Sequence, residues 1–222
     1  SISDRMVLSN MAIEMGGKTG MVESDEKTYQ YLEGRVKGGK STINRLKAEE
    51  KRFVTDLESP SLEIRDIDVD DLEPLLSCPP NVDNVKPASE VDVEIDQVFL
   101  GSCTNGRMED METAYKILNG KKVADGVRCI IIPGTMQILR ECVEKGYYTA
   151  FIDAGAVVST PTCGPCLGGY MGILAADERC IATTNRNFVG RMGHVESEVY
   201  LASPATAAAS ALTGYITEPK EV

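Results

Sequence analysis

The stretch STPTCGPCLGG at residues 159–169 holds two cysteines, Cys163 and Cys166, among prolines and glycines. Proline restricts the backbone φ angle and glycine permits close backbone approach, so such a loop holds two sulfurs in defined positions. A third cysteine, Cys103, lies in GSCTNG (101–106), directly after an apolar run. Our first hypothesis is that these three thiolates hold a four-iron cluster and leave one iron open to a ligand.

The C-x-x-C spacing by itself is also compatible with two other sites. A thioredoxin-like dithiol uses the same spacing, but it would not need Cys103, and this chain has no tryptophan of the kind usual beside that motif. A structural zinc site needs a fourth ligand, for which Cys78 and His194 are the candidates in principle. Spacing alone therefore leaves cluster, zinc and dithiol open.

The other cysteines do not resemble ligands. Cys129 and Cys180 lie within apolar strand patterns, Cys142 lies on an apolar helix face, and Cys78 lies in a proline-rich segment. Free cysteine is among the most frequently buried residues, so we expect most of these four in the core.

Composition narrows the class of protein. The 222 residues are 42% hydrophobic and 26% charged, as in ordinary globular domains, and no apolar run is long enough to span a membrane. The net charge of −11 argues against nucleic-acid binding, which needs a basic surface. The odd count of seven cysteines and the lack of a secretory signal favour metal or redox chemistry in the cytoplasm over a disulfide framework.

The pattern along the chain changes near a proline-rich crossing at 74–89, which we take as a domain boundary between 1–75 and 76–222. Before it we expect helices at 3–16 and 24–37. We expect either a connector or an exposed helix at 38–62, and a strand at 62–69.

After the crossing, strands alternate with helices. The expected strands are 91–101, 128–133, 148–155 and 179–185, and the expected helices are 108–118, 135–145, 167–176 and 204–211. Such alternation predicts an α/β fold with a mainly parallel sheet, and ligands bind such sheets beyond the carboxyl ends of the strands. Cys103 and Arg186 each follow a predicted strand, and Cys163 lies in a strand-to-helix loop. The three motifs therefore fall at one edge of the sheet.

Arg186 and Arg191 lie in NRNFVGR (185–191), where a strand passes into a loop. Guanidinium groups bind carboxylates through two nitrogens, so this string suits a small polyanionic acid. An isolated pair of arginines is more often a surface feature, and Asn105 and Arg107 beside Cys103 are equally ambiguous. Glu14 lies one turn from Asn10 on the first helix, where pattern alone indicates a solvated carboxylate.

Taken together, four strings resemble the aconitase superfamily, in detail the large subunits of its isopropylmalate isomerase and homoaconitase branch. They are NMAIEMGGKTG (10–20), SCTNGR (102–107), TCGPCLG (162–168) and NRNFVGR (185–191). Their order matches and they run almost end to end. The resemblance implies a three-layer α/β/α domain that binds the cluster, preceded by part of another α/β domain.

The resemblance also implies roles for individual residues. Cys103, Cys163 and Cys166 would ligate a [4Fe–4S] cluster whose open iron binds substrate. Arg186, Arg191 and Glu14 would be catalytic. Substrate would be bound by both arginines together with three asparagines, Asn10, Asn105 and Asn185.

The implied reaction is isomerisation of a hydroxy di- or tricarboxylic acid by dehydration and rehydration, as in leucine biosynthesis. A homoaconitase activity is one alternative, and an iron–sulfur or dithiol module without catalytic activity is another. Family large subunits are nearly twice this length, and a separate small subunit supplies the swivelling domain with a catalytic serine. We therefore expect a fragment that is inactive alone and works in a hetero-oligomer with that small subunit.

Overall fold

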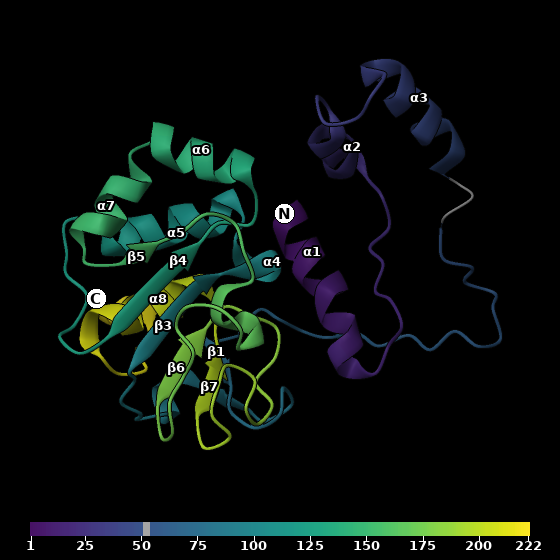
Figure 1. The fold of residues 1–222 in the computed structure, drawn as a ribbon. Helices are drawn as coiled ribbons and strands as arrows, with labels where there is room; N and C mark the ends of the chain where they lie inside the picture. The colour runs from purple at the N-terminus through teal and green to yellow at the C-terminus, as the bar shows by residue number, and fades with distance from the viewer. Residues whose placement is uncertain (51–53) are drawn as a thin grey trace. The chain divides into compact units, whose positions relative to one another are not determined.

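The computed structural model describes residues 1–50 and 54–222, which form two compact units, Ser1–Asp71 and Leu72–Val222 (Figure 1). Each unit is described by itself. No helix in the described ranges combines the length and apolar character needed to cross a bilayer.

The first unit is helical. It contains α1 (Ile2–Met11), the 3₁₀ helix η1 (Ala12–Met15), α2 (Glu26–Leu32) and α3 (Gly39–Glu49). The helix expected over 3–16 therefore changes type at Met11, and Gly16 ends it with a left-handed φ of 81°. Asn10 therefore lies in α1 and Glu14 in the more tightly wound η1.

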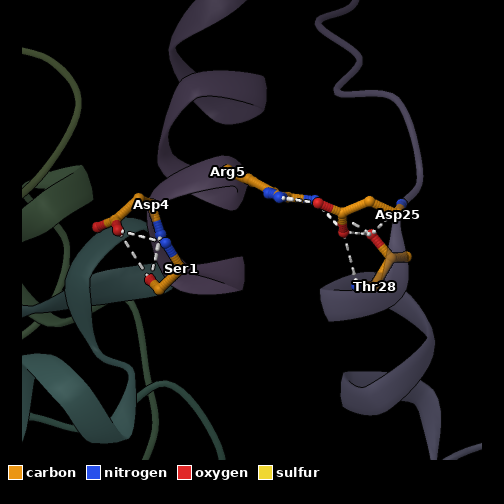
Figure 2. A network of polar contacts seen from close by, with 5 residues as sticks. All are labelled: Ser1, Asp4, Arg5, Asp25 and Thr28. Carbon is orange, nitrogen blue, oxygen red and sulfur yellow. Dashed lines mark hydrogen bonds and ion pairs between the residues drawn. The ribbon is translucent and has the colours of Figure 1, made fainter.

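A charged pair joins two helices of this unit (Figure 2). Arg5 of α1 binds Asp25 through two nitrogens, at 2.8 Å and 2.6 Å. Asp25 also caps α2 by accepting from the backbone nitrogen of Thr28. The Arg5 guanidinium is the main cause that lowers the pKa of the Asp25 carboxyl. The pair thus links α1 to the start of α2.

For residues 38–62 the sequence left two expectations open, a connector or an exposed helix. The structure has a helix there, since α3 covers Gly39–Glu49. Residues 51–53 of the expected connector lie outside the described residues. The strand expected at 62–69 is wrong: these residues form no strand, and Ile64, Ile67 and Val69 are all exposed. Alternation marks a strand only where a neighbour pairs with it, and no such neighbour is present among the described residues.

Within the described residues the second unit contains a seven-stranded sheet in the order β2-β1-β7-β6-β3-β4-β5. The strands are β1 (Leu75–Ser77), β2 (Val85–Pro87), β3 (Gln97–Gly101), β4 (Arg128–Ile132), β5 (Val157–Val158), β6 (Arg179–Ala182) and β7 (Glu198–Leu201). β3 to β7 run parallel to one another, which confirms the α/β class and the mainly parallel sheet. β7 also pairs with β1, in the antiparallel sense. β1 and β2 form an antiparallel hairpin where the sequence predicted only an irregular crossing.

The order of the parallel strands reverses beside β3. From β3 the chain proceeds outward through β4 and β5, then returns to build β6 and β7 on the other side. Such a switch point opens a crevice at the carboxyl ends of the two central strands, here β3 and β6.

Helices cover one face of the sheet (Figure 1). They are α5 (Met108–Leu118), α6 (Met136–Glu144), α7 (Tyr147–Asp153) and α8 (Pro204–Thr213), and their buried residues join one core with Val98, Leu100 and Ile131. The other face carries Phe99, Ile132 and Cys180, and it is covered by irregular segments that bring Cys166, Leu174 and Met192 onto it. The short elements are α4 (Ser102–Asn105) and the 3₁₀ turns η3 (Ala88–Glu90), η4 (Gly164–Leu167) and η5 (Pro219–Glu221).

In the second unit several expected elements are confirmed and two are wrong. α5, α8, β4 and β6 lie where the pattern predicts them. Residues 148–155 are mainly helical, as α7, because Phe151 and Ala154 turn toward the core at helical spacing. Residues 167–176 form bends instead of a helix, because left-handed Gly168 and Gly172 interrupt regular winding.

Candidate functional site

The segment with Cys103 is tied to the neighbouring strand at the switch point. The backbone nitrogen of Gly101, at the end of β3, donates to Thr183 Oγ1 at 2.8 Å, and this hydroxyl donates back to Gly101 O at 3.1 Å. Asn105 Nδ2 donates to Thr183 O at 3.0 Å. α4, with Cys103, is therefore held against the end of β6, and Asn105 supports that arrangement.

The turn from β3 into α4 requires glycine. Gly101 has a φ of 141°, and a Cβ atom there would lie 2.0 Å from Ile132 O. The next residue, Ser102, also has a positive φ, 77°. Unusual backbone of this kind persists only where the surrounding structure holds it, and it is common at functional sites.

The loop with the other two cysteines is packed on the end of β4. Tyr148 of α7 donates its hydroxyl to Ser159 O at 2.9 Å, which holds the start of the loop. Further on, a Cβ at Gly164 would lie 2.5 Å from Ile132 Cδ1. The Cys166 nitrogen donates to Cys163 O at 3.0 Å. The two cysteines thus lie in one tight turn at the carboxyl edge of the sheet.

Arg191 contacts this turn from the segment that follows β6. Its Nη2 donates to Cys166 Sγ at 3.5 Å, and its guanidinium lies over the Phe188 ring, 5.3 Å from the centroid. Burial raises the pKa of the Cys166 thiol, and the Arg191 guanidinium opposes that rise. Negative charge on Cys103 or Cys163 would raise this pKa further, so both of these sulfurs lie within electrostatic range of Cys166.

The seven cysteines divide as the sequence predicts. Cys103 and Cys163 are exposed and Cys166 is buried at the edge of the sheet. The other four are buried, and burial raises the pKa of Cys129 and Cys180 to about 12 and that of Cys142 to about 11. Their expected place in the core is confirmed.

Among the described residues no three His, Cys, Asp or Glu side chains surround a common position suited to a single metal ion. An iron–sulfur cluster makes a different demand, since its thiolates bind different irons and need not meet at one point. Three cysteines of suitable chemistry, two of them exposed at one sheet edge, fit that demand.

Four buried polar atoms in the described residues lack a hydrogen-bond partner, and all belong to the segments that follow β3 and β6. They are Thr104 Oγ1, Thr184 Oγ1, Asn187 Oδ1 and Arg191 Nε. Buried polar groups are nearly always paired, so these side-chain atoms are candidates to contact a bound polar group or an ordered water.

The remaining expected site residues fall in two places. Asn185 is buried and Arg186 half-buried in the segment after β6, beside the switch point. Asn187, in the same string, instead donates to Ser77 O and Cys78 O and so ties this segment to the β1–β2 hairpin. Asn10 and Glu14 belong to the first unit, where both are half-buried.

Sequence reasoning missed three supporting residues, namely Thr183, Tyr148 and Gln97. Gln97 is fully buried in β3, where its Nε2 donates to Gly172 O at 2.9 Å and its Oε1 accepts from Arg128 Nε at 3.1 Å. The sequence did contain a signal for Gln97, because it is a polar residue within the otherwise apolar run that ends at residue 101.

The second unit is thus an α/β domain whose cysteine and arginine motifs meet at the switch point of a parallel sheet. The model of the aconitase family (aconitate hydratase) matches residues 1–92 and 83–214, and the chain belongs to this family.

Curated relatives narrow the similarity. The chain is 55% identical over 223 residues to the 3-isopropylmalate dehydratase large subunit of Thermoanaerobacter sp. (strain X514), covering 100% of this chain and 51% of that protein. It is 54% identical to the probable 3-isopropylmalate dehydratase large subunit of Methanothermobacter thermautotrophicus, covering 99% and 50%, respectively. The protein of that name from Halothermothrix orenii is 53% identical, with 100% and 51% covered. The chain spans about half the length of these relatives.

Proposed function

We propose that this chain forms the cluster-binding part of the large subunit of a [4Fe–4S] hydro-lyase, a 3-isopropylmalate dehydratase. One observation carries the proposal. Cys103, the Cys163–Cys166 turn and Arg191 come from three separate segments, and they meet at one edge of the sheet in a chain 55% identical to such large subunits.

Cys103, Cys163 and Cys166 are the residues that would hold the cluster. When bound, the cluster supplies an open iron that acts as a Lewis acid toward the substrate hydroxyl. The exposure of Cys103 and Cys163 supports this assignment, because the cluster must be inserted and the substrate must reach it. Burial of Cys166 beneath Arg191 keeps the third ligand in place.

The arginines bind and orient the acid. Arg186 and Arg191 each offer a planar donor pair to a carboxylate, and their positive charge counters the net charge of −11. Asn185 and Asn105 are assigned to substrate binding together with them. Arg191 Nε is buried without a hydrogen-bond partner among the described residues, while its Nη2 contacts Cys166.

Glu14 and Asn10 are proposed to reach the hydroxyl that leaves as water and returns. The full reaction removes water from a hydroxy-acid to form an alkene and adds it back with the hydroxyl on the neighbouring carbon. The proton removed from carbon needs a base, which we assign to the small-subunit partner. That partner also contributes contacts that distinguish isopropylmalate from related acids, so the chain alone is expected to be inactive.

Anaerobic reconstitution with iron and sulfide tests the proposal. Wild type should develop the broad visible absorption of a four-iron cluster, with matching iron and sulfide contents, and Cys103→Ala should not. Cys129→Ala is the matched control, because this buried cysteine lies in the core, and it should reconstitute like wild type.

Two outcomes would contradict the proposal. The first is a redox potential that is the same in Cys103→Ala as in wild type, because a dithiol formed by Cys163 and Cys166 does not need Cys103. If wild type forms no cluster, the test is repeated with a full-length large subunit, and failure there too would refute the cysteine assignment. Addition of the small subunit and 3-isopropylmalate to the reconstituted full-length protein then tests activity.

A further inference from the structure

Two threonine hydroxyls at the switch point lack partners. Thr104 and Thr184 are 1% and 5% exposed, and neither Oγ1 has a hydrogen-bond partner among the described residues. Other buried threonines of the same unit are satisfied: Thr183 bonds with Gly101, and Thr206 in α8 bonds with Ser203 Oγ at 3.1 Å. The two unpartnered hydroxyls are therefore a local exception.

Both hydroxyls belong to segments that frame the cysteine site. Thr104 directly follows Cys103 in α4, and Asn105 next to it bonds to Thr183 O, so α4 lies against the segment with Thr184. The ladder between β3 and β6 extends by one bond, from Thr183 N to Phe99 O. Thr184 directly follows Thr183, in the segment that leads on to Arg191, whose Nη2 contacts Cys166 Sγ.

We propose that the hydroxyls of Thr104 and Thr184 donate hydrogen bonds to sulfur atoms of the iron–sulfur group held by the three cysteines. This inference rests on the proposed function. Burial distinguishes these hydroxyls from Arg186, which is half-buried and can meet a substrate that enters and leaves. Neutral donors buried in the segments that carry Cys103 and Arg191 suit a resident acceptor, and hydrogen bonds to the sulfurs are one of the factors that set the potential of such a group.

The test compares reconstituted full chains that differ at one threonine. Thr104→Val and Thr184→Val keep the side-chain shape and remove the donor, and Thr104→Ser and Thr184→Ser restore it. Thr206→Val is the matched control, because it removes a buried hydroxyl far from the cysteines in the sequence, on α8. The readouts are the midpoint potential, the electron paramagnetic resonance spectrum of the reduced cluster, and the rate of iron loss to a chelator.

The valine variants should still form the cluster, with a more negative potential and iron loss several-fold faster than wild type, and the serine variants should return both values toward wild type. Thr206→Val should change neither. Unchanged potential and iron loss in both valine variants would overturn the inference while the proposed function stands.

Two further results also decide against the inference. A weaker affinity for succinate with an unchanged potential would assign the hydroxyls to the substrate carboxylate instead. Absence of a cluster in wild type, both in this chain and in a full-length large subunit, would overturn the inference together with the proposed function.

Discussion

Arg191 donates from Nη2 to Cys166 Sγ across 3.5 Å, and this contact joins the segment after β6 to the cysteine turn after β5. A Cβ at Gly168 would lie 3.2 Å from Arg191 O, so the two backbones also lie close together. Any group that binds at the cysteines therefore has a guanidinium within its reach.

Replacement of Arg191 by lysine tests its role toward an anion. Arg191→Lys keeps the charge and loses the planar pair of donors, so binding of succinate to the reconstituted protein should weaken roughly 10- to 100-fold. Isothermal calorimetry measures the change. Arg179→Lys is the control, because Arg179 pairs with Glu198 at the start of β6, the opposite end from the site. Equal affinity in Arg191→Lys and wild type would exclude a direct contact with the anion.

Thiol reactivity should follow burial in the metal-free protein. Cys103 and Cys163 are exposed and should react with iodoacetamide at pH 8 within minutes, whereas Cys129 and Cys180 should remain unmodified in the folded state. The latter two have a pKa of about 12, so little thiolate is present, and they are also inaccessible. Mass spectrometry of peptides from natively labelled protein gives the order. Rapid labelling of Cys129 would contradict its placement in the core.

Gly101→Ala should destabilise the second unit strongly. The new Cβ would meet Ile132 O at 2.0 Å and the φ of 141° would be strained, so we expect the free energy of unfolding to fall by about 3 kcal/mol or more. Gly126→Ala is the matched control: its φ is 88°, no atom lies near its Cβ position, and its cost should be about 1–2 kcal/mol. Urea unfolding measures both, and equal costs would contradict the close approach of β3 and β4.

Gln97 should prove to be an anchor of the cysteine loop. Gln97→Met nearly conserves volume but leaves Gly172 O and Arg128 Nε without their partner, so unfolding should become easier by about 2 kcal/mol or more. The exposed Gln137→Met on α6 is the control and should change stability by less than about 0.5 kcal/mol. Urea unfolding compares the two. If Gln97→Met is as stable as wild type, the buried bonds do not hold the loop.

Stability in acid should depend on Glu178. Arg128 binds both of its carboxylate oxygens at 2.8 Å and holds the pKa of Glu178 below its ordinary 4.5. Because the folded pKa lies below the unfolded one, this stabilisation is complete above pH 4.5 and is lost as the pH falls through the folded pKa. Glu178→Gln should therefore be less stable than wild type at pH 7, and the difference should shrink below pH 4.5.

Thermal unfolding from pH 3 to pH 7 measures that difference. The exposed Glu144→Gln is its control and should show no such convergence with wild type. A difference between Glu178→Gln and wild type that stays constant across this range would show that the carboxylate charge does not stabilise the fold.

Local patterns predicted much of the second unit. α5 begins and ends where the pattern predicts it. Its buried residues Met111, Ala114 and Leu118 recur at helical spacing, and this spacing can be seen in the sequence alone. The same reasoning failed at 62–69 and 167–176. Residues 62–69 alternate as a strand would, but no neighbouring strand among the described residues pairs with them. In 167–176 the left-handed conformation of Gly168 and Gly172 prevents the helix that the apolar content predicts.

The sequence by itself determined the family, the α/β class and the residue types of the site, because these follow from local periodicity and from short strings such as TCGPCLG. Only the tertiary structure decided that β6 lies beside β3, that Arg191 reaches Cys166, and that Thr104 and Thr184 are buried without partners. The physical reason is distance along the chain. Strand order and side-chain contacts depend on the packing of segments far apart in sequence, which local propensity does not encode.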